Sequence, residues 1–159
     1  MPRTPRPGAH AALTSDTPDE VEAQFYEALQ NADLELLMAV WADDDEIVCV
    51  HPGGGRLVGA AAIRTSFEAI FGNGAVPVRP EQVHRLQWVG GALHHLTERI
   101  EVPAEGGGSG SSGDTQVAWV LTTNVYVKTP QGWRLAAHHA SAGSPDDLSG
   151  PGDAPATLH

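Results

Sequence analysis

The spacing of apolar residues changes along the chain from a helical period to a strand-like alternation. From Pro18 to Trp41 apolar side chains recur at helical intervals, which predicts a helical hairpin interrupted at residues 31–33. Thr17 precedes a proline and two acidic residues, a pattern typical of a helix start. A third helix is predicted from Ala60 to Phe71, where a glycine-rich turn ends it.

The remaining apolar runs are short and rich in β-branched and aromatic residues, and they predict strands. They cover residues 46–51, 56–59, 80–89, 92–102, 115–128 and 132–141. Glycine and proline between them supply the turns. The predicted order is ααββαββββ, an α+β fold in which three helices pack on a strongly curved mixed, mainly antiparallel sheet.

Both ends of the chain differ in composition from its middle. Residues 1–18 and 144–159 are rich in proline and small polar residues, and we expect them to be disordered tails around a domain at residues 19–143. The Gly/Ser-rich stretch 103–114 predicts a flexible hairpin loop. A phosphate-binding loop would need a Lys-Ser/Thr ending and a following helix, and this stretch has neither.

Charge and cysteine content narrow the class of protein. The net charge of −11 makes nucleic acid a poor partner, because an acidic surface repels phosphates. No run has the length of a membrane span, and the N-terminus lacks the apolar core of a signal peptide, so we expect a cytoplasmic protein without a membrane partner. Cys49, in an apolar run, is predicted to be a buried and inert thiol.

Three motifs in this order resemble the nuclear transport factor 2-like, SnoaL-like superfamily of cone-shaped, cystatin-like α+β domains. They are LLMAVWADD (residues 36–44), HPGGGRLVGAAAI (51–63) and GWRLAAHHAS (132–141). The resemblance implies an apolar cavity for a small hydrophobic molecule and a homodimer formed through the outer faces of the long strands. It leaves the activity open, because this fold carries isomerases, dehydratases, cyclases and binding domains.

The last strand and the end of the second helix supply the candidate catalytic residues. Strict alternation places His139 on the face of Trp133 and Leu135, toward the cavity, and His138 on the outer face beside Arg134. In superfamily members that act as isomerases, an Asp in the cavity works as a base, and the resemblance places Asp44 in that zone. The alternatives are that Asp44 only ends the helix and that His139 is structural.

Further side chains are expected to line the cavity as ligand contacts. They are Tyr26, Trp41, His51, Phe67, Trp88, Trp119 and Asn124. Asn124 is unusual in an apolar strand, since a buried amide needs hydrogen-bond partners. Glu98 shares its strand face with apolar residues, so it is either a buried carboxylate or part of an ion pair across the dimer.

Metal and cofactor sites are not predicted. The histidine pairs 94–95 and 138–139 each point to opposite faces of a strand, and the chain lacks an HExxH motif and a cysteine cluster. Two functions follow as hypotheses. One is acid–base isomerase, dehydratase or cyclase chemistry, and the other is a non-catalytic small-molecule-binding or dimeric interaction domain. Metal-assisted oxygenation or hydrolysis is a third and weaker alternative.

Overall fold

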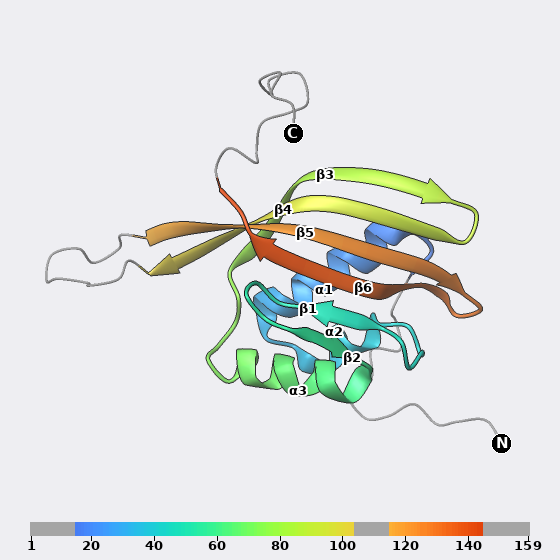
Figure 1. The fold of residues 1–159 in the computed structure, drawn as a ribbon, viewed down its shortest axis with the longest axis horizontal. Helices are drawn as coiled ribbons and strands as arrows, with labels where there is room; N and C mark the ends of the chain where they lie inside the picture. The colour runs from blue at the N-terminus through green and yellow to red at the C-terminus, as the bar shows by residue number, and fades with distance from the viewer. Residues whose placement is uncertain (1–14, 104–114, 145–159) are drawn as a thin grey trace, which may run out of the picture.

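Three helices and six strands make up the computed structural model, which describes residues 15–103 and 115–144. In chain order they are α1 (Pro18–Asn31), α2 (Leu34–Ala39), β1 (Val48–Val50), β2 (Arg56–Val58), α3 (Ala60–Phe71), β3 (Val78–Trp88), β4 (Gly91–Pro103), β5 (Thr115–Thr129) and β6 (Gly132–Ala142). This order confirms the predicted ααββαββββ arrangement (Figure 1).

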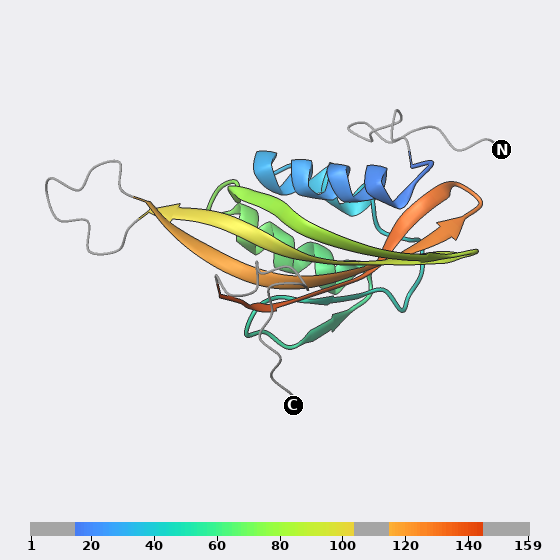
Figure 2. The same cartoon turned by 90° about the horizontal axis from the view of Figure 1, so that it is seen from above.

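The strands form one open sheet in the order β2-β1-β6-β5-β4-β3. The hairpin β1–β2 and the meander β3–β4–β5–β6 pair antiparallel, and β1 pairs with β6 in parallel. The sheet is therefore mixed and mainly antiparallel, as predicted. Figure 2 shows α1 lying along the twisted face of the long strands. Within residues 15–103 and 115–144, no helix lies on the opposite face of these strands (Figure 2).

Local sequence signals explain where the helices begin. The Thr17 hydroxyl accepts a hydrogen bond from the backbone N–H of Glu20, and Pro18 occupies the first turn. The residue before α3, Gly59, has a φ of 92°, a left-handed conformation that favours glycine. Both α1 and α3 begin at the residues predicted from the sequence.

The core lies between the helices and the inner face of the sheet. Its members include Val21, Phe25, Leu29, Leu37, Ile63, Phe67, Leu96, Tyr126 and Leu135. Cys49 is also buried there, as expected for an inert thiol. Polar side chains of α1 and β4 enter the same layer, and they form the site described below.

A β-bulge in β6 changes which face its side chains occupy. Val125 of β5 pairs with Ala137, while the next residue, Tyr126, pairs with Leu135, so Ala136 is an extra residue in β6. The backbone of Leu135 bonds the segment before β1, through Val40 and Ala42, whereas β6 from Ala137 onward pairs with β1. The bulge lies where the neighbour of β6 changes.

The segment that precedes α1 packs against β6. Ser15 is buried, its carbonyl accepts a hydrogen bond from the backbone N–H of Trp133 at 2.7 Å, and its hydroxyl contacts the Arg134 guanidinium. The rest of the N-terminal tail, the 104–114 loop and the C-terminal tail from 145 lie outside the described residues. Among the helices of the described part, none is long and apolar enough to cross a membrane.

Candidate functional site

Four polar side chains meet in the interior between α1 and the sheet. The Tyr26 hydroxyl donates a hydrogen bond to Glu98 Oε2 at 2.7 Å, and Asn124 Nδ2 donates to the Tyr26 hydroxyl oxygen at 3.3 Å. Asn124 Oδ1 lies 2.7 Å from His138 Nδ1. All four residues are buried. Tyr26 comes from α1, and the other three come from β4, β5 and β6.

Burial controls the ionisation of the acid and the phenol in this network. Glu98 is 5% exposed, and among the described residues it forms no ion pair. Desolvation raises the pKa of Glu98, and the hydrogen bond from Tyr26 opposes this shift. Desolvation, followed by the charge of Glu98, raises the pKa of Tyr26 well above its usual range. The site therefore holds a carboxyl with a raised pKa beside a hydroxyl that stays protonated.

His138 is neutral in this environment. Burial, followed by the neighbouring His51 and His139, lowers the pKa of His138 to about 3. A neutral imidazole has one N–H, and the carbonyl oxygen of Asn124 identifies Nδ1 as the donor. The Phe25 ring packs on the imidazole with 4.9 Å between ring centroids. His138 thus presents a fixed tautomer whose Nε2 is an acceptor.

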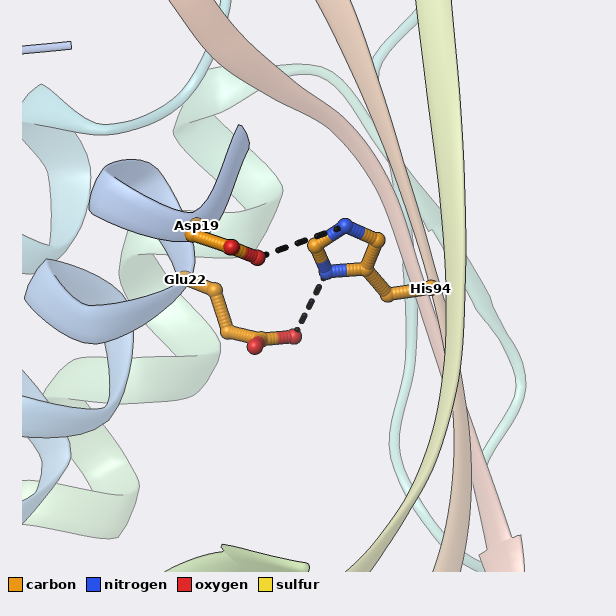
Figure 3. A group of neighbouring side chains, drawn as sticks. All are labelled: Asp19, Glu22 and His94. Carbon is orange, nitrogen blue, oxygen red and sulfur yellow. Dashed lines mark hydrogen bonds and ion pairs between the residues drawn. The ribbon is translucent and has the colours of Figure 1, made fainter. Parts of the chain in front are cut away.

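A second polar cluster lies farther toward the N-terminal end of α1. His94 Nδ1 is 2.9 Å from Glu22 Oε1, and His94 Nε2 is 3.8 Å from Asp19 Oδ1 (Figure 3). Glu22 and His94 are buried, whereas Asp19 is exposed. The Tyr126 hydroxyl donates to Glu22 Oε1 at 3.4 Å. Asp19, Glu22 and His94 form the one group of acidic and histidine side chains in the described residues whose spacing suits a metal ion.

His51 directly follows β1, which ends one residue earlier than predicted, and it is half-buried. Its Nε2 lies 3.0 Å from the Ser66 hydroxyl, and its ring meets the edge of Phe67 at 5.0 Å between centroids. Burial lowers the pKa of His51. The charge of His51 contributes to the lowered pKa of His138, and the exposed glycine turn follows His51 directly in the chain. His51 therefore links the polar network to the surface.

The placement predicted for the two adjacent histidines is wrong. His138 is inside and His139 is exposed on the outer face of the sheet, because the bulge at Ala136 shifts the alternation by one residue. A groove of about 500 Å³ crosses that outer face. It is lined by His95, Leu121, Thr123, Val125, Ala137, His139 and Ser141.

Asp44 and His139 do not come together in the interior. Asp44 is exposed, and its Oδ1 accepts a hydrogen bond from the backbone N–H of Glu46 at 2.8 Å. The carboxylate shapes the turn after α2. Asp44 does not end the helix either, because α2 ends at Ala39, and the predicted Asp–His pair is absent from the described residues.

The aromatic residues that were predicted to line the cavity lie in three different environments. Phe67 is in the core, and Trp41 is buried beside a pocket between α2 and α3. Trp119 lies on the outer face, where the Arg99 guanidinium is 5.9 Å from its ring centre, and Trp88 is 51% exposed near the β3–β4 turn. The expectation that Trp88 and Trp119 line the interior is therefore wrong, since both belong to outward or edge positions of the sheet.

Sequence reasoning missed Glu22 and His94 and assigned His138 to the wrong face. The signal for His94 was present, because every second residue of an unbroken strand lies on the same face, and His94 therefore shares its face with Leu96 and Glu98. Glu22 lies one turn before Phe25 and Tyr26 on the inner face of α1. For His138 no signal existed, since the bulge falls within Ala136-Ala137 and carries neither glycine nor proline.

Three helices packed on an open, mixed six-stranded sheet are the fold of the nuclear transport factor 2-like class of domains. The profile of the SnoaL-like domain family matches residues 19–145. The chain therefore belongs to the SnoaL-like domain family. No functionally curated protein matches it.

Solved structures of similar proteins carry several functional descriptions. A protein from Thiobacillus denitrificans, provisionally assigned as a calcium/calmodulin-dependent protein kinase type II association domain, is 30% identical with a TM-score of 0.70, over 82% of this chain and 98% of the other. A provisionally assigned dehydratase of the NTF2-like family from Streptomyces avermitilis is 30% identical with a TM-score of 0.67, over 80% of this chain and 99% of the other.

A more distant structure shows likeness of fold alone. The ketosteroid isomerase-like protein from Erwinia carotovora atroseptica is 16% identical with a TM-score of 0.61, over 86% of this chain and 99% of the other.

Proposed function

We propose that this protein transfers protons on a small, mainly apolar molecule that carries a carbonyl group, in an isomerase or dehydratase reaction. The observation that carries this proposal is Glu98, a buried carboxyl with a raised pKa and a hydrogen bond from Tyr26. A carboxyl of this kind exchanges protons closer to neutral pH than an exposed one. The 30% identity to a protein assigned as an NTF2-like dehydratase supports the same class of chemistry.

The arrangement of the donors supports a specific sequence of events. Glu98 as a carboxylate removes a proton from the carbon next to the carbonyl. Once Glu98 carries that proton, it attracts the Tyr26 hydroxyl less strongly, and the hydroxyl is free to donate to the negative oxygen of the substrate. Glu98 then returns the proton to another carbon in an isomerisation, or to a departing hydroxyl in a dehydration.

Deuterium exchange tests this proposal without knowledge of the natural substrate. The protein is incubated in D2O with cyclic and polycyclic ketones, and NMR follows the loss of protons next to the carbonyl. Replacing Glu98→Gln preserves the shape of the side chain and removes its proton exchange, so the exchange rate should fall about 10²–10⁴-fold. The matched control is Glu46→Gln, because Glu46 is exposed. Equal rates in the Glu98→Gln variant and the unaltered chain contradict the proposal.

A second candidate is a dimeric assembly domain, and two observations favour it. The outer groove centred on Thr123 and Val125 crosses the helix-free face of the sheet. The 30% identical Thiobacillus denitrificans protein is assigned to an association domain. A second copy of this chain, packed on that face, would bury the groove and the exposed His139.

Solution mass measurements test the assembly candidate. If two copies pack through the outer face, light scattering should give twice the chain mass, and Val125→Arg should reduce it to the mass of one chain, because an unpaired buried charge is costly. Val58→Arg, on the edge strand β2 and 44% exposed, is the control that should remain dimeric. A single-chain mass for the unaltered protein contradicts this candidate.

A further inference from the structure

In the polar cluster of Asp19, Glu22 and His94, only one of the two ring nitrogens of His94 makes a hydrogen bond to the described residues. Glu22 Oε1 accepts from His94 Nδ1 at 2.9 Å, which places a proton on Nδ1. In the neutral tautomer with this proton, the other ring nitrogen, Nε2, carries a lone pair. It makes no hydrogen bond to the described residues and lies 3.8 Å from Asp19 Oδ1, beyond hydrogen-bond range (Figure 3).

Two acceptors that face each other across 3.8 Å leave room for a cation between them. The Asp19 carboxylate and the Nε2 lone pair repel one another unless a proton or a metal ion lies between them. His94 is 2% exposed, so its imidazole cannot simply turn toward bulk water. Glu22 is 6% exposed, and its Oε1 accepts hydrogen bonds from His94 Nδ1 and from the Tyr126 hydroxyl, which hold the carboxylate in place.

The donor set fits a divalent transition-metal ion. Metal–nitrogen and metal–oxygen bonds of about 2.0–2.2 Å separate neighbouring ligand atoms by about 3.3 Å in a tetrahedral site. A contraction of the 3.8 Å gap by a few tenths of an ångström reaches that value, and the exposed Asp19 side chain is free to make it. A carboxylate that accepts from the non-ligating ring N–H, here Glu22, is the usual outer partner of a metal-bound histidine.

We propose that Asp19 and His94 Nε2 bind a divalent cation of the Zn²⁺ class, with Glu22 holding the His94 ring and water completing the coordination. Asp19 and Glu22 lie one turn apart on α1, and His94 faces them from β4. The site lies at one end of the seam between α1 and β4, whereas Tyr26 and Glu98 meet farther along the same seam.

Arg85 competes with the cation for Asp19. Its Nε donates to Asp19 Oδ1 at 2.8 Å, the same oxygen that faces His94. The Arg85 side chain is 50% exposed, so it can leave at little cost when a metal ion arrives. This competition predicts that removal of Arg85 strengthens metal binding, which a purely structural role of the cluster would not produce.

Calorimetric titration of the metal-free full chain with Zn²⁺ tests the proposal. We expect one saturable site that is lost in Asp19→Asn and His94→Gln, is about 10–100-fold weaker in Glu22→Gln, and is tighter in Arg85→Gln. Asp19→Asn is the decisive variant because Asp19 is exposed and its replacement leaves the core intact. His84→Gln and His139→Gln are controls, since both histidines are exposed outside the cluster.

A second measurement separates a bound metal from a protonated histidine. In a ¹H–¹⁵N spectrum that detects ring nitrogens, Zn²⁺ should shift His94 Nε2 while Nδ1 keeps its proton. The proposal is overturned if the unaltered chain binds no Zn²⁺, if Asp19→Asn binds it with unchanged affinity, or if the spectrum of His94 shows both nitrogens protonated and insensitive to Zn²⁺.

Discussion

Tyr26 of α1 donates a hydrogen bond of 2.7 Å to Glu98 of β4, across a separation of 72 positions in the chain. Glu22 and His94, which also form a hydrogen bond between α1 and β4, are likewise 72 positions apart. Glu22 and Tyr26 are one turn apart on α1, and His94 and Glu98 share one face of β4. The helix therefore runs along the strand in the same direction, and its polar side chains meet those of the strand in the buried layer.

Loss of the Tyr26 hydroxyl should destabilise the fold and change the titration of Glu98. Tyr26→Phe removes one hydrogen bond from the buried Glu98 carboxyl and the acceptor of Asn124 Nδ2, so the free energy of unfolding should fall by about 1–3 kcal/mol. The Tyr26 hydrogen bond lowers the pKa of Glu98, so that pKa should rise further in the variant. Urea denaturation and ¹³C NMR of the Glu98 carboxyl measure the two effects.

The control for this variant is Tyr126→Phe. Tyr126 is also buried, but its hydroxyl donates to Glu22 at 3.4 Å. Its replacement should leave the pKa of Glu98 unchanged. A matching shift of Glu98 in both variants would show that general loosening of the core, and not the Tyr26 bond, controls this carboxyl.

The two adjacent histidines should respond to mutation in opposite ways. His138→Ala removes the partner of Asn124 and the packing against Phe25, and we expect a loss of about 2–4 kcal/mol in the free energy of unfolding. His139→Ala, on the outer face, should change the stability of a single chain by less than about 0.5 kcal/mol. Thermal and urea unfolding of both variants, at concentrations where the chain is monomeric, compare them directly. Equal losses would contradict the inverted placement.

Acid should weaken the fold through His138. Its pKa is about 3 in the folded chain and about 6.5 when unfolded, so the unfolded state binds more protons between these values. The stabilising contribution is present above pH 6.5 and is lost as the pH falls toward 3, at no more than about 1.4 kcal/mol per pH unit. The raised pKa of Glu98 acts in the opposite direction, because its contribution is lost as the pH rises through the folded pKa.

A difference measurement isolates the histidine from Glu98. In His138→Asn the amide nitrogen takes the place of Nδ1 and does not titrate. The stability advantage of the unaltered chain over this variant should therefore shrink steadily from pH 6.5 to 4.5. Chemical denaturation at several pH values gives this difference, and a constant difference would mean that His138 titrates normally.

Cys49 should react with thiol reagents only when the chain opens. It is buried, and desolvation, followed by the charge of Glu98, raises the pKa of its thiol to about 12. Because the thiolate is the reactive form, a disulfide exchange reagent at pH 8 should label the folded protein far more slowly than the urea-unfolded chain. Rapid labelling of one thiol in the folded protein would contradict the burial of Cys49.

The sequence was a good guide to the order of the helices and to the bounds of α1 and α3, whereas α2 ends at Ala39, before Trp41. Thr17 with Pro18 identifies the start of α1, because this signal depends on contacts within one turn. Alternation also placed Glu98 and His94 on one face of β4, since that strand pairs with β5 without interruption. Local chemistry and an unbroken period were sufficient for these elements.

Tertiary structure alone decided which histidine of β6 is inside. The extra residue Ala136 appears where β6 changes its neighbour from the 40–42 segment to β1, and that exchange depends on residues far away in the chain. One inserted residue reverses every side chain after it, because the period of a strand is two residues. The same dependence on distant partners explains why Glu22 and His94, 72 positions apart, become one cluster only when α1 packs on β4.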